Sequence, residues 1–180
     1  MFDIKFRIVD DLEYLENVSA QKFDDDGADI EGFFQLNFDG NIEGHYKEGN
    51  LNGFEVGHEL ITLWFDLLIE VILILKRKSN YVALKEIESI DSWFEFTLID
   101  EILYVSYANC IEKNSELFII TSKKECFLYQ TWKEISIPFN EFRDKVKMKA
   151  KQYINEIENI NPKLLDTKII SKLYRKLESI

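Results

Sequence analysis

The carboxylates with the most regular spacing in this chain form a single series, Glu55, Glu59, Asp66 and Glu70, with Thr62 among them. Successive members are 4, 3, 4 and 4 residues apart, which matches the period of an α-helix and predicts one narrow stripe. Carboxylates grouped in a cleft can shift one another's pKa and carry acid-base chemistry. The ordinary interpretation is a wet stripe on an otherwise buried helix, and a catalytic or small-ligand site is the alternative.

Other residues that bind metals or act as bases are few. His45 and His58 are not spaced as zinc ligands and are interpreted as structural or surface histidines. Cys110 and Cys126 are expected to be reduced, packed thiols, because they are predicted to lie in different, non-adjacent strands. The aspartates at 24–29 have loop spacing but do not match a complete EF-hand, so no calcium site is predicted.

The sequence motifs of common catalytic sites are missing from this chain. It has no glycine-rich phosphate loop, nucleophile elbow, HExxH zinc motif or CxxC pair. A non-enzymatic protein is therefore expected, with no catalytic residue, no cofactor and no metal site.

The element that would position the carboxylate stripe is a helix predicted from Glu55 to Lys78. Apolar residues occupy most of its circumference, so protein is expected on more than one side of it. Its apolar run, residues 60–75, is shorter than the roughly 20 residues that span a membrane and contains Asp66 and Glu70. A buried helix of a folded domain is predicted.

Alternating apolar residues and turn signals predict strands around this helix. The Asp39-Gly40 pair supplies the positive φ of a tight hairpin, and the short connections after residue 93 predict a four-strand antiparallel meander. The predicted strands are 2–9, 32–38, 42–47, 93–99, 102–109, 116–121 and 126–132, with a short apolar segment at 81–87. The predicted fold is α+β, with an antiparallel sheet of about six or seven strands packed on the 55–78 helix.

The last 40 residues differ in character from the rest. An apolar stripe from Phe139 to Ile160 predicts one helix, and Asn161 followed by Pro162 predicts the start of another. Residues 1–180 are expected to form a single domain, in which this C-terminal pair packs on the sheet domain. The lysines of the first helix are interpreted as a solvated face, and a site for an anionic partner is the alternative.

Charge is unevenly distributed along the chain. Residues 1–140 hold 27 acidic and 12 basic side chains, whereas residues 141–180 hold 6 and 10. Such an acidic surface repels nucleic acid and anionic membranes and attracts a basic protein, or it serves only to keep an aromatic-rich chain soluble. The first residues do not form a secretory signal, so a cytoplasmic protein is expected.

Three segments carry a resemblance to a known class of proteins: EGFFQLNFDGNIEGHYKEGN, ELITLWFDLLIEVILILKRKSNYVALKEIES and WFEFTLIDEILYVSYAN. Together they resemble the small acidic bacterial immunity proteins that are encoded beside polymorphic or contact-dependent toxins. The likeness covers about residues 30–132 and consists of a hairpin, a tryptophan-bearing amphipathic helix and an aromatic meander. It implies a non-enzymatic protein that binds a cognate toxin domain with a basic surface and occludes its site.

In that interpretation, acidic side chains steer the toxin and neighbouring aromatic residues, where exposed, anchor it. The predicted partner-binding residues are Asp24, Asp25, Asp26, Asp29, Glu31, Phe33 and Tyr46. The alternative is a structural or regulatory interaction module that self-associates through its C-terminal helices.

Overall fold

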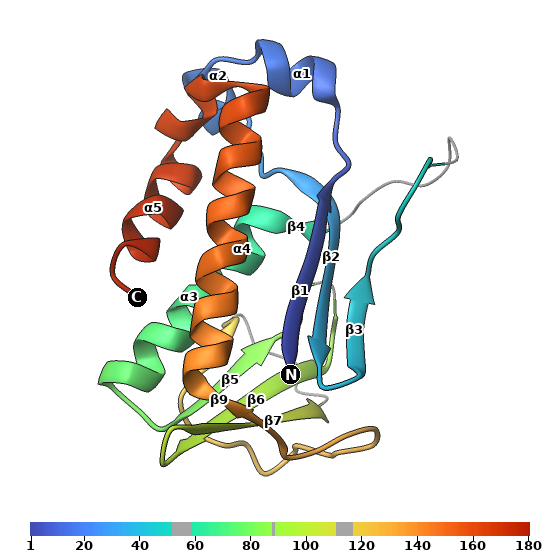
Figure 1. Cartoon of the computed structure of the whole chain (residues 1–180), viewed down its shortest axis with the longest axis vertical. Coiled ribbons are helices and arrows are strands. Elements are labelled where there is room, and N and C mark those ends of the chain that lie inside the picture. Colours follow the sequence, from blue (N-terminus) through green and yellow to red (C-terminus); the bar gives the residue numbers. More distant parts are fainter. Residues whose placement is uncertain (52–58, 88, 111–116) are drawn as a thin grey trace.

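A computed structural model describes residues 1–51, 59–87, 89–110 and 117–180, and it has an α+β architecture with two antiparallel sheets (Figure 1). The first sheet contains β1 (Phe2–Ile8), β2 (Glu31–Phe38), β3 (Asn41–His45) and β4 (Glu59–Leu60). The second sheet contains, in spatial order, β8 (Ile119–Ile120), β5 (Tyr81–Lys85), β6 (Ser92–Ile99), β7 (Ile102–Asn109) and β9 (Ile135–Pro138).

The predicted hairpins β2–β3 and β6–β7 are confirmed by their register. β1 pairs with β2 so that Phe2 lies opposite Phe38, and the alternation of β1 buries Phe2, Ile4 and Phe6. In the β2–β3 turn, Asp39 and Gly40 both have positive φ, 54° and 92°. The two central residues of the β6–β7 turn also have positive φ.

The prediction of one sheet with six or seven strands is wrong, because the strands divide into sheets of four and five. The predicted meander is also wrong, since β8 pairs with β5 at the far edge of the second sheet. Residues 126–132 form no strand; a single bridge joins Leu128 to Asn109. The edge beside β7 is instead taken by β9, a short strand ending in Pro138.

The central helix is α3 (Ile61–Arg77), and it begins later than predicted. Glu59 belongs to β4 and pairs with Gly32, so the chain is extended at this point. Glu55 and His58 lie outside the described residues. Helix α3 packs against both sheets and against the C-terminal helices, as its apolar circumference predicts. Within the described part of the chain, no helix has the length and hydrophobicity to cross a membrane.

The first C-terminal helix is confirmed as α4 (Phe139–Ile160). The second differs from the prediction, because Asn161 caps a 3₁₀ helix, η1 (Pro162–Asp166), and α5 (Lys168–Leu177) starts after it. Thr167 has extended backbone angles and separates the two. In Figure 1, α4 runs along the first sheet with α5 on its other side, and the second sheet lies at the opposite end from α1 and α2.

The connection between β1 and β2 contains two short helices, α1 (Leu12–Asn17) and α2 (Ala20–Asp25), and the end of α2 overlaps the aspartates at 24–29 that were predicted to lie in a loop. Asp11 and Ser19 cap them by accepting hydrogen bonds from main-chain N–H groups. Leu15 and Phe23 are buried, which fixes both helices to the body of the protein. Turn-rich composition concealed helices that have only six residues each.

Aromatic side chains join the layers of the core. Phe34 stacks on Trp64 with ring centroids 5.3 Å apart, and Phe65 stacks on Tyr153 at 5.3 Å. These pairs connect the first sheet to α3 and α3 to α4.

The prediction of two reduced cysteines is wrong for this structure, in which Cys110 and Cys126 form a disulfide. Main-chain hydrogen bonds between Asn109 and Leu128 carry the segment before β9 back across the second sheet. The Cα atoms of the two cysteines are therefore 5.2 Å apart. The disulfide holds residues 122–134, here termed the strap, against the second sheet. Phe127 packs on the sheet face that points away from α3, whereas Trp132 stacks on Tyr107 of the opposite face.

Candidate functional site

The predicted acidic residues lie at the end of the molecule formed by α1, α2 and the start of β2 (Figure 1). Two hydrogen bonds hold this end together. The Tyr14 hydroxyl of α1 donates to Asp26 at the end of α2, at 2.9 Å, and the main-chain N–H of Glu31 donates to Asp10, also at 2.9 Å. We call this region the acidic end.

Two of the predicted partner-binding carboxylates are used within the protein. Asp29 accepts hydrogen bonds from the main-chain N–H groups of Thr62 and Leu63, at 3.2 and 3.1 Å, at the start of α3. Asp24 accepts one from the N–H of Lys168, the first residue of α5, at 2.9 Å. Both carboxylates therefore satisfy helix N-termini.

Burial raises the pKa of Asp29, and hydrogen bonds from Thr62, Ile30 and Leu63 oppose that rise. The carboxyl group is thus costly to ionise where it stands, although it is well supplied with donors. Its role in the fold leaves it poorly placed for a partner.

The other three predicted acids face solvent to different degrees. Asp25 and Glu31 are exposed. Asp26 is exposed too, but it pairs with Lys22, and this hydrogen bond, together with that of Tyr14, lowers the pKa of Asp26. Asp25 and Glu31 are accordingly the predicted acids best placed to meet a protein.

The two predicted aromatic anchors have neighbours within the chain. Phe33 is buried, and its ring meets the ring of His45 edge-on at 5.1 Å, so the exposure required of an anchor is not met. Tyr46 is half-buried, and the Lys5 ammonium lies over its ring at 5.2 Å.

Residues of α1 complete the acidic end and were not singled out from the sequence. Glu13 and Glu16 are exposed on α1, and Leu12 between them and Asp11 is 51% exposed. An exposed aliphatic side chain between charged chain neighbours is suited to be an interface anchor with a polar rim. The signal available in the sequence was the density of acids after Asp10.

The carboxylate stripe of α3 pairs with lysines of α5. Asp66 lies 2.9 Å from both Lys172 and Lys176, and Glu70 lies 3.0 Å from Lys176. Burial alone would lower the pKa of Lys176, but hydrogen bonds to the two carboxylates raise it. Glu59 accepts a hydrogen bond from the Trp64 indole at 2.6 Å. The cavity beside Asp66 measures about 80 Å³, which is small for an organic ligand.

A second polar cluster lies between the strap and the second sheet. Glu95 is 4% exposed and accepts a hydrogen bond from the Tyr81 hydroxyl at 2.6 Å, while the Lys123 ammonium lies 3.7 Å away. Burial, and then Glu95, raise the pKa of Tyr81 far above its usual range. The Tyr129 hydroxyl is buried close to this carboxylate without a hydrogen bond of normal geometry among the described residues. The cluster neutralises a buried charge and positions the strap.

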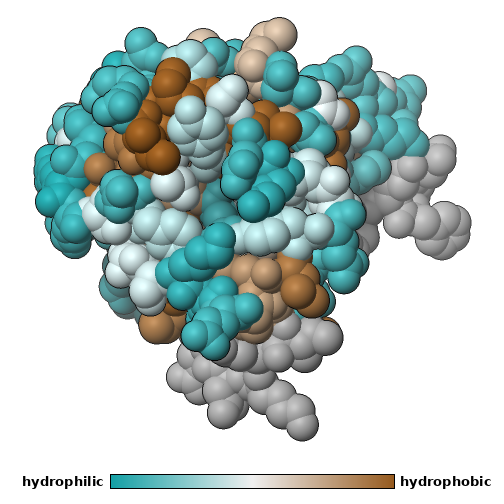
Figure 2. Space-filling view, turned by 90° about the horizontal axis from the view of Figure 1, so that it is seen from below, coloured by the Kyte–Doolittle hydropathy of each residue, from teal (hydrophilic) through white to brown (hydrophobic). Residues whose placement is uncertain are grey.

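The underside of the molecule, seen in Figure 2, carries apolar patches divided by hydrophilic side chains. The second sheet and its connections contribute several exposed large apolar residues: Ile90, Ile99, Leu117, Phe118 and Leu128. Across the described ranges, no three His, Cys, Asp or Glu side chains are grouped so that they could hold a metal ion.

Comparison of the chain with protein-family models, with curated proteins and with solved structures finds no match. The described residues define an acidic α+β protein with a charged, partly apolar end.

Proposed function

We propose that this chain is a non-enzymatic immunity protein that binds a cognate bacterial toxin domain and neutralises it by occluding its site. The acidic end supplies the binding surface, and the toxin presents a basic one. The observation that carries the proposal is the exposed Leu12 of α1, at an end of the molecule that also exposes the carboxylates Glu13, Glu16, Asp25 and Glu31. The resemblance of residues 30–132 to immunity proteins supports the same function.

Charge complementarity would act mainly on the rate of association and on the choice of partner. Leu12 would then be desolvated at the centre of the contact. Truncation of such an anchor costs about 2 kcal/mol or more in binding free energy. The proposed compartment is the cytoplasm, where the toxin would act.

The test uses the gene next to the one that encodes this chain. Its C-terminal domain is expressed alone and together with the full chain, and growth and complex formation are measured. We expect growth arrest by the domain alone, rescue on co-expression, and a complex that survives purification. A toxic neighbouring domain that neither binds the chain nor loses toxicity in its presence would overturn the proposal.

A matched pair of variants locates the surface. Leu12→Ser removes the apolar anchor at the acidic end, and Leu128→Ser removes a leucine on the strap that is somewhat more exposed, 61% against 51%. We expect weaker protection from the first variant and wild-type protection from the second.

A further inference from the structure

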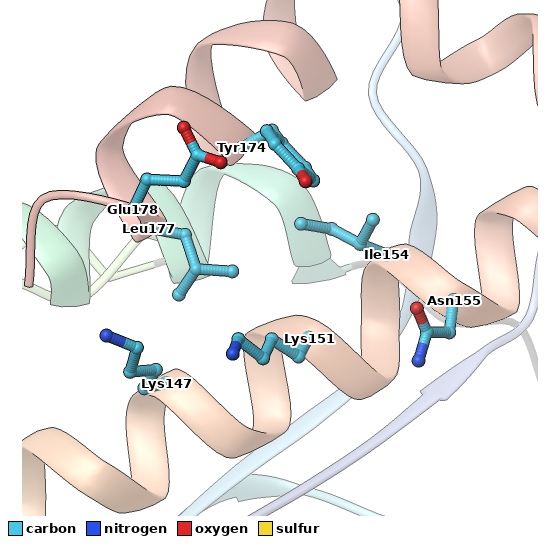
Figure 3. Close-up of a pocket in the computed structure, with 7 residues that line it drawn as sticks. All are labelled: Lys147, Lys151, Ile154, Asn155, Tyr174, Leu177 and Glu178. Carbon is cyan, nitrogen blue, oxygen red and sulfur yellow. The ribbon is translucent and has the colours of Figure 1, made fainter.

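The helices α4 and α5 leave a groove between them that no part of the chain described by the structure fills. Figure 3 shows one hollow of this groove, about 510 Å³, with Lys147 and Lys151 on the α4 wall and Tyr174 and Leu177 on the α5 wall. A second hollow of about 510 Å³ adjoins it, and the two share Ile154, Asn155 and Tyr174. Tyr174 thus stands between two cavities.

The exposure of Tyr174 is unusual for its setting. Its side chain is 49% exposed, while Ile154 and Leu177 beside it are buried and form an apolar floor. Tyrosine on an apolar floor next to an unfilled cavity is typical of residues that anchor a protein interface. The groove therefore has the anatomy of a contact surface.

The charges of α4 along this groove are self-complementary. Lys151 and Glu158 are exposed, and neither has an ion-pair partner among the described residues. They are two turns apart, about 10 Å, and the midpoint between them falls at Ile154 and Asn155, level with Tyr174. A second copy of α4, antiparallel to the first and related by a two-fold axis at this midpoint, would place each Lys151 opposite the other copy's Glu158.

The distribution of charge permits such a contact. The whole chain has a net charge of −11, which repels a second copy, but residues 141–180 carry 6 acidic and 10 basic side chains. The helical face is consequently the least acidic part of the chain. Repulsion between more distant acidic surfaces is screened beyond about 8 Å at physiological ionic strength.

The face is also large enough. Helix α4 has 22 residues and is about 33 Å long. Helix α5 has 10 residues and is about 15 Å long, and each helix is about 10 Å wide, so the footprint is on the order of 500 Å² per protomer. The total of about 1,000 Å² is at the lower limit for a specific interface.

We propose that the α4–α5 face is a two-fold dimer interface and that a second copy of this chain occupies the groove. In the dimer, the Tyr174 side chain of each protomer fills a hollow of the other, and Lys151 and Glu158 form two equivalent ion pairs across the axis. The proposal goes beyond toxin binding, because neither hollow is lined by residues of α1 or α2.

Sedimentation velocity of the full chain, over concentrations up to the high micromolar range, tests the dimer. The monomer mass is 21.3 kDa, and we expect a species of twice that mass. Lys151→Glu and Glu158→Lys should each weaken association about tenfold or more, since each creates two like-charge contacts. The double variant should restore it, because the charges are exchanged across the axis. Tyr174→Ser should weaken it as well.

Lys149→Glu is the matched control, with the same charge change on α4 at a residue outside the groove, and it should leave the dimer unchanged. Circular dichroism of each variant shows whether it folds. A monomer at every concentration would overturn the proposal, and so would single reversals that leave the dimer intact or a double variant that stays monomeric.

Discussion

Asp29 joins two elements through a single side chain. It lies just before β2, and its carboxylate accepts the main-chain N–H groups that open α3. Leu60, the residue in the capping position itself, makes no side-chain cap. Asp29 therefore acts as the helix cap although it lies 33 positions before Thr62 in the chain, and local sequence patterns do not encode a cap at that distance.

Asp29→Ala should lower the free energy of unfolding by about 1–2 kcal/mol, the usual loss when a helix cap is removed. Asp29→Asn retains one acceptor and no charge, so a smaller loss is expected. Urea denaturation at neutral pH measures both values. Equal stability of wild type and Asp29→Ala would show that the cap contributes nothing.

The same residue predicts a pH effect. Burial holds the pKa of Asp29 above its unfolded value, so the folded state binds more protons than the unfolded state between those two pKa values. The stability that arises from this raised pKa is therefore fully present below the unfolded pKa, about 3.9, and is lost as pH rises through the folded pKa, whereas the capping hydrogen bonds to Thr62 and Leu63 remain. Relative to Asp29→Asn, the wild type should gain stability on acidification from neutral pH. A constant difference between the two proteins would contradict this.

At the scale of elements, α5 is attached to α3 by charge as well as by apolar contacts. Lys176 is partly buried between Asp66 and Glu70, and its removal leaves Lys172 as the remaining ion-pair partner of Asp66 among the described residues. Substituting one member of such a network is costly because the charge left behind stays poorly solvated.

Lys176→Met should therefore destabilise the protein by about 2 kcal/mol. Asp66→Asn in the same chain should recover part of that loss, because the stranded charge is removed. Thermal unfolding of the single and double variants measures the coupling. Additive losses in the two variants would show that the residues do not interact.

The strap is the second element whose attachment can be measured. The disulfide joins residues separated by 16 positions, and closing a loop of that size stabilises a protein by about 3 kcal/mol in the chain-entropy model. Replacing Cys110 and Cys126 by serine should lower the free energy of unfolding by about 2–4 kcal/mol. Dithiothreitol should destabilise the wild type similarly and leave the serine variant unaffected. A wild type indifferent to the reductant would contradict a closed disulfide.

Redox state also bears on the proposed compartment. Disulfides are uncommon in the cytoplasm, where thiols are kept reduced. Labelling of free thiols in protein taken directly from cells distinguishes the two states, and reduced cysteines are expected if the protein acts in the cytoplasm.

Local features were predictable from the sequence to the extent that local physics determines them. Alternation in β1, the Asp39-Gly40 turn and the apolar stripe of α4 all gave correct elements. The division into two sheets depends on which strands pair across long connections. The position of the strap depends on a bridge to β7 that its own sequence does not predict. Long-range partners also determine which acids are available to a partner. Asp24 and Asp29 are of the same residue type as the exposed acids, but each caps a helix that lies far away in the sequence.

At the scale of the whole molecule, acidic and basic side chains are concentrated on different surfaces. The acidic end presents Leu12, Glu16 and Asp25 to solvent, and the C-terminal helices carry the surplus of lysine. One surface is proposed for a basic partner and the other for a second copy of the chain, so the two contacts can be altered separately.

The central claim is that the acidic end binds a basic toxin domain. Glu16→Lys with Asp25→Lys reverses two exposed charges near helix C-termini, where cations are favoured, so the fold is preserved. Glu101→Lys with Glu125→Lys makes the same net change in residues of the second sheet and the strap.

The affinity of these two variants for the neighbouring toxin domain, measured by calorimetry at two salt concentrations, is the most direct test. We expect the acidic-end variant to lose about tenfold or more in affinity and most of its salt dependence, while the control variant stays near the wild type. Equal affinity of both variants would contradict the account.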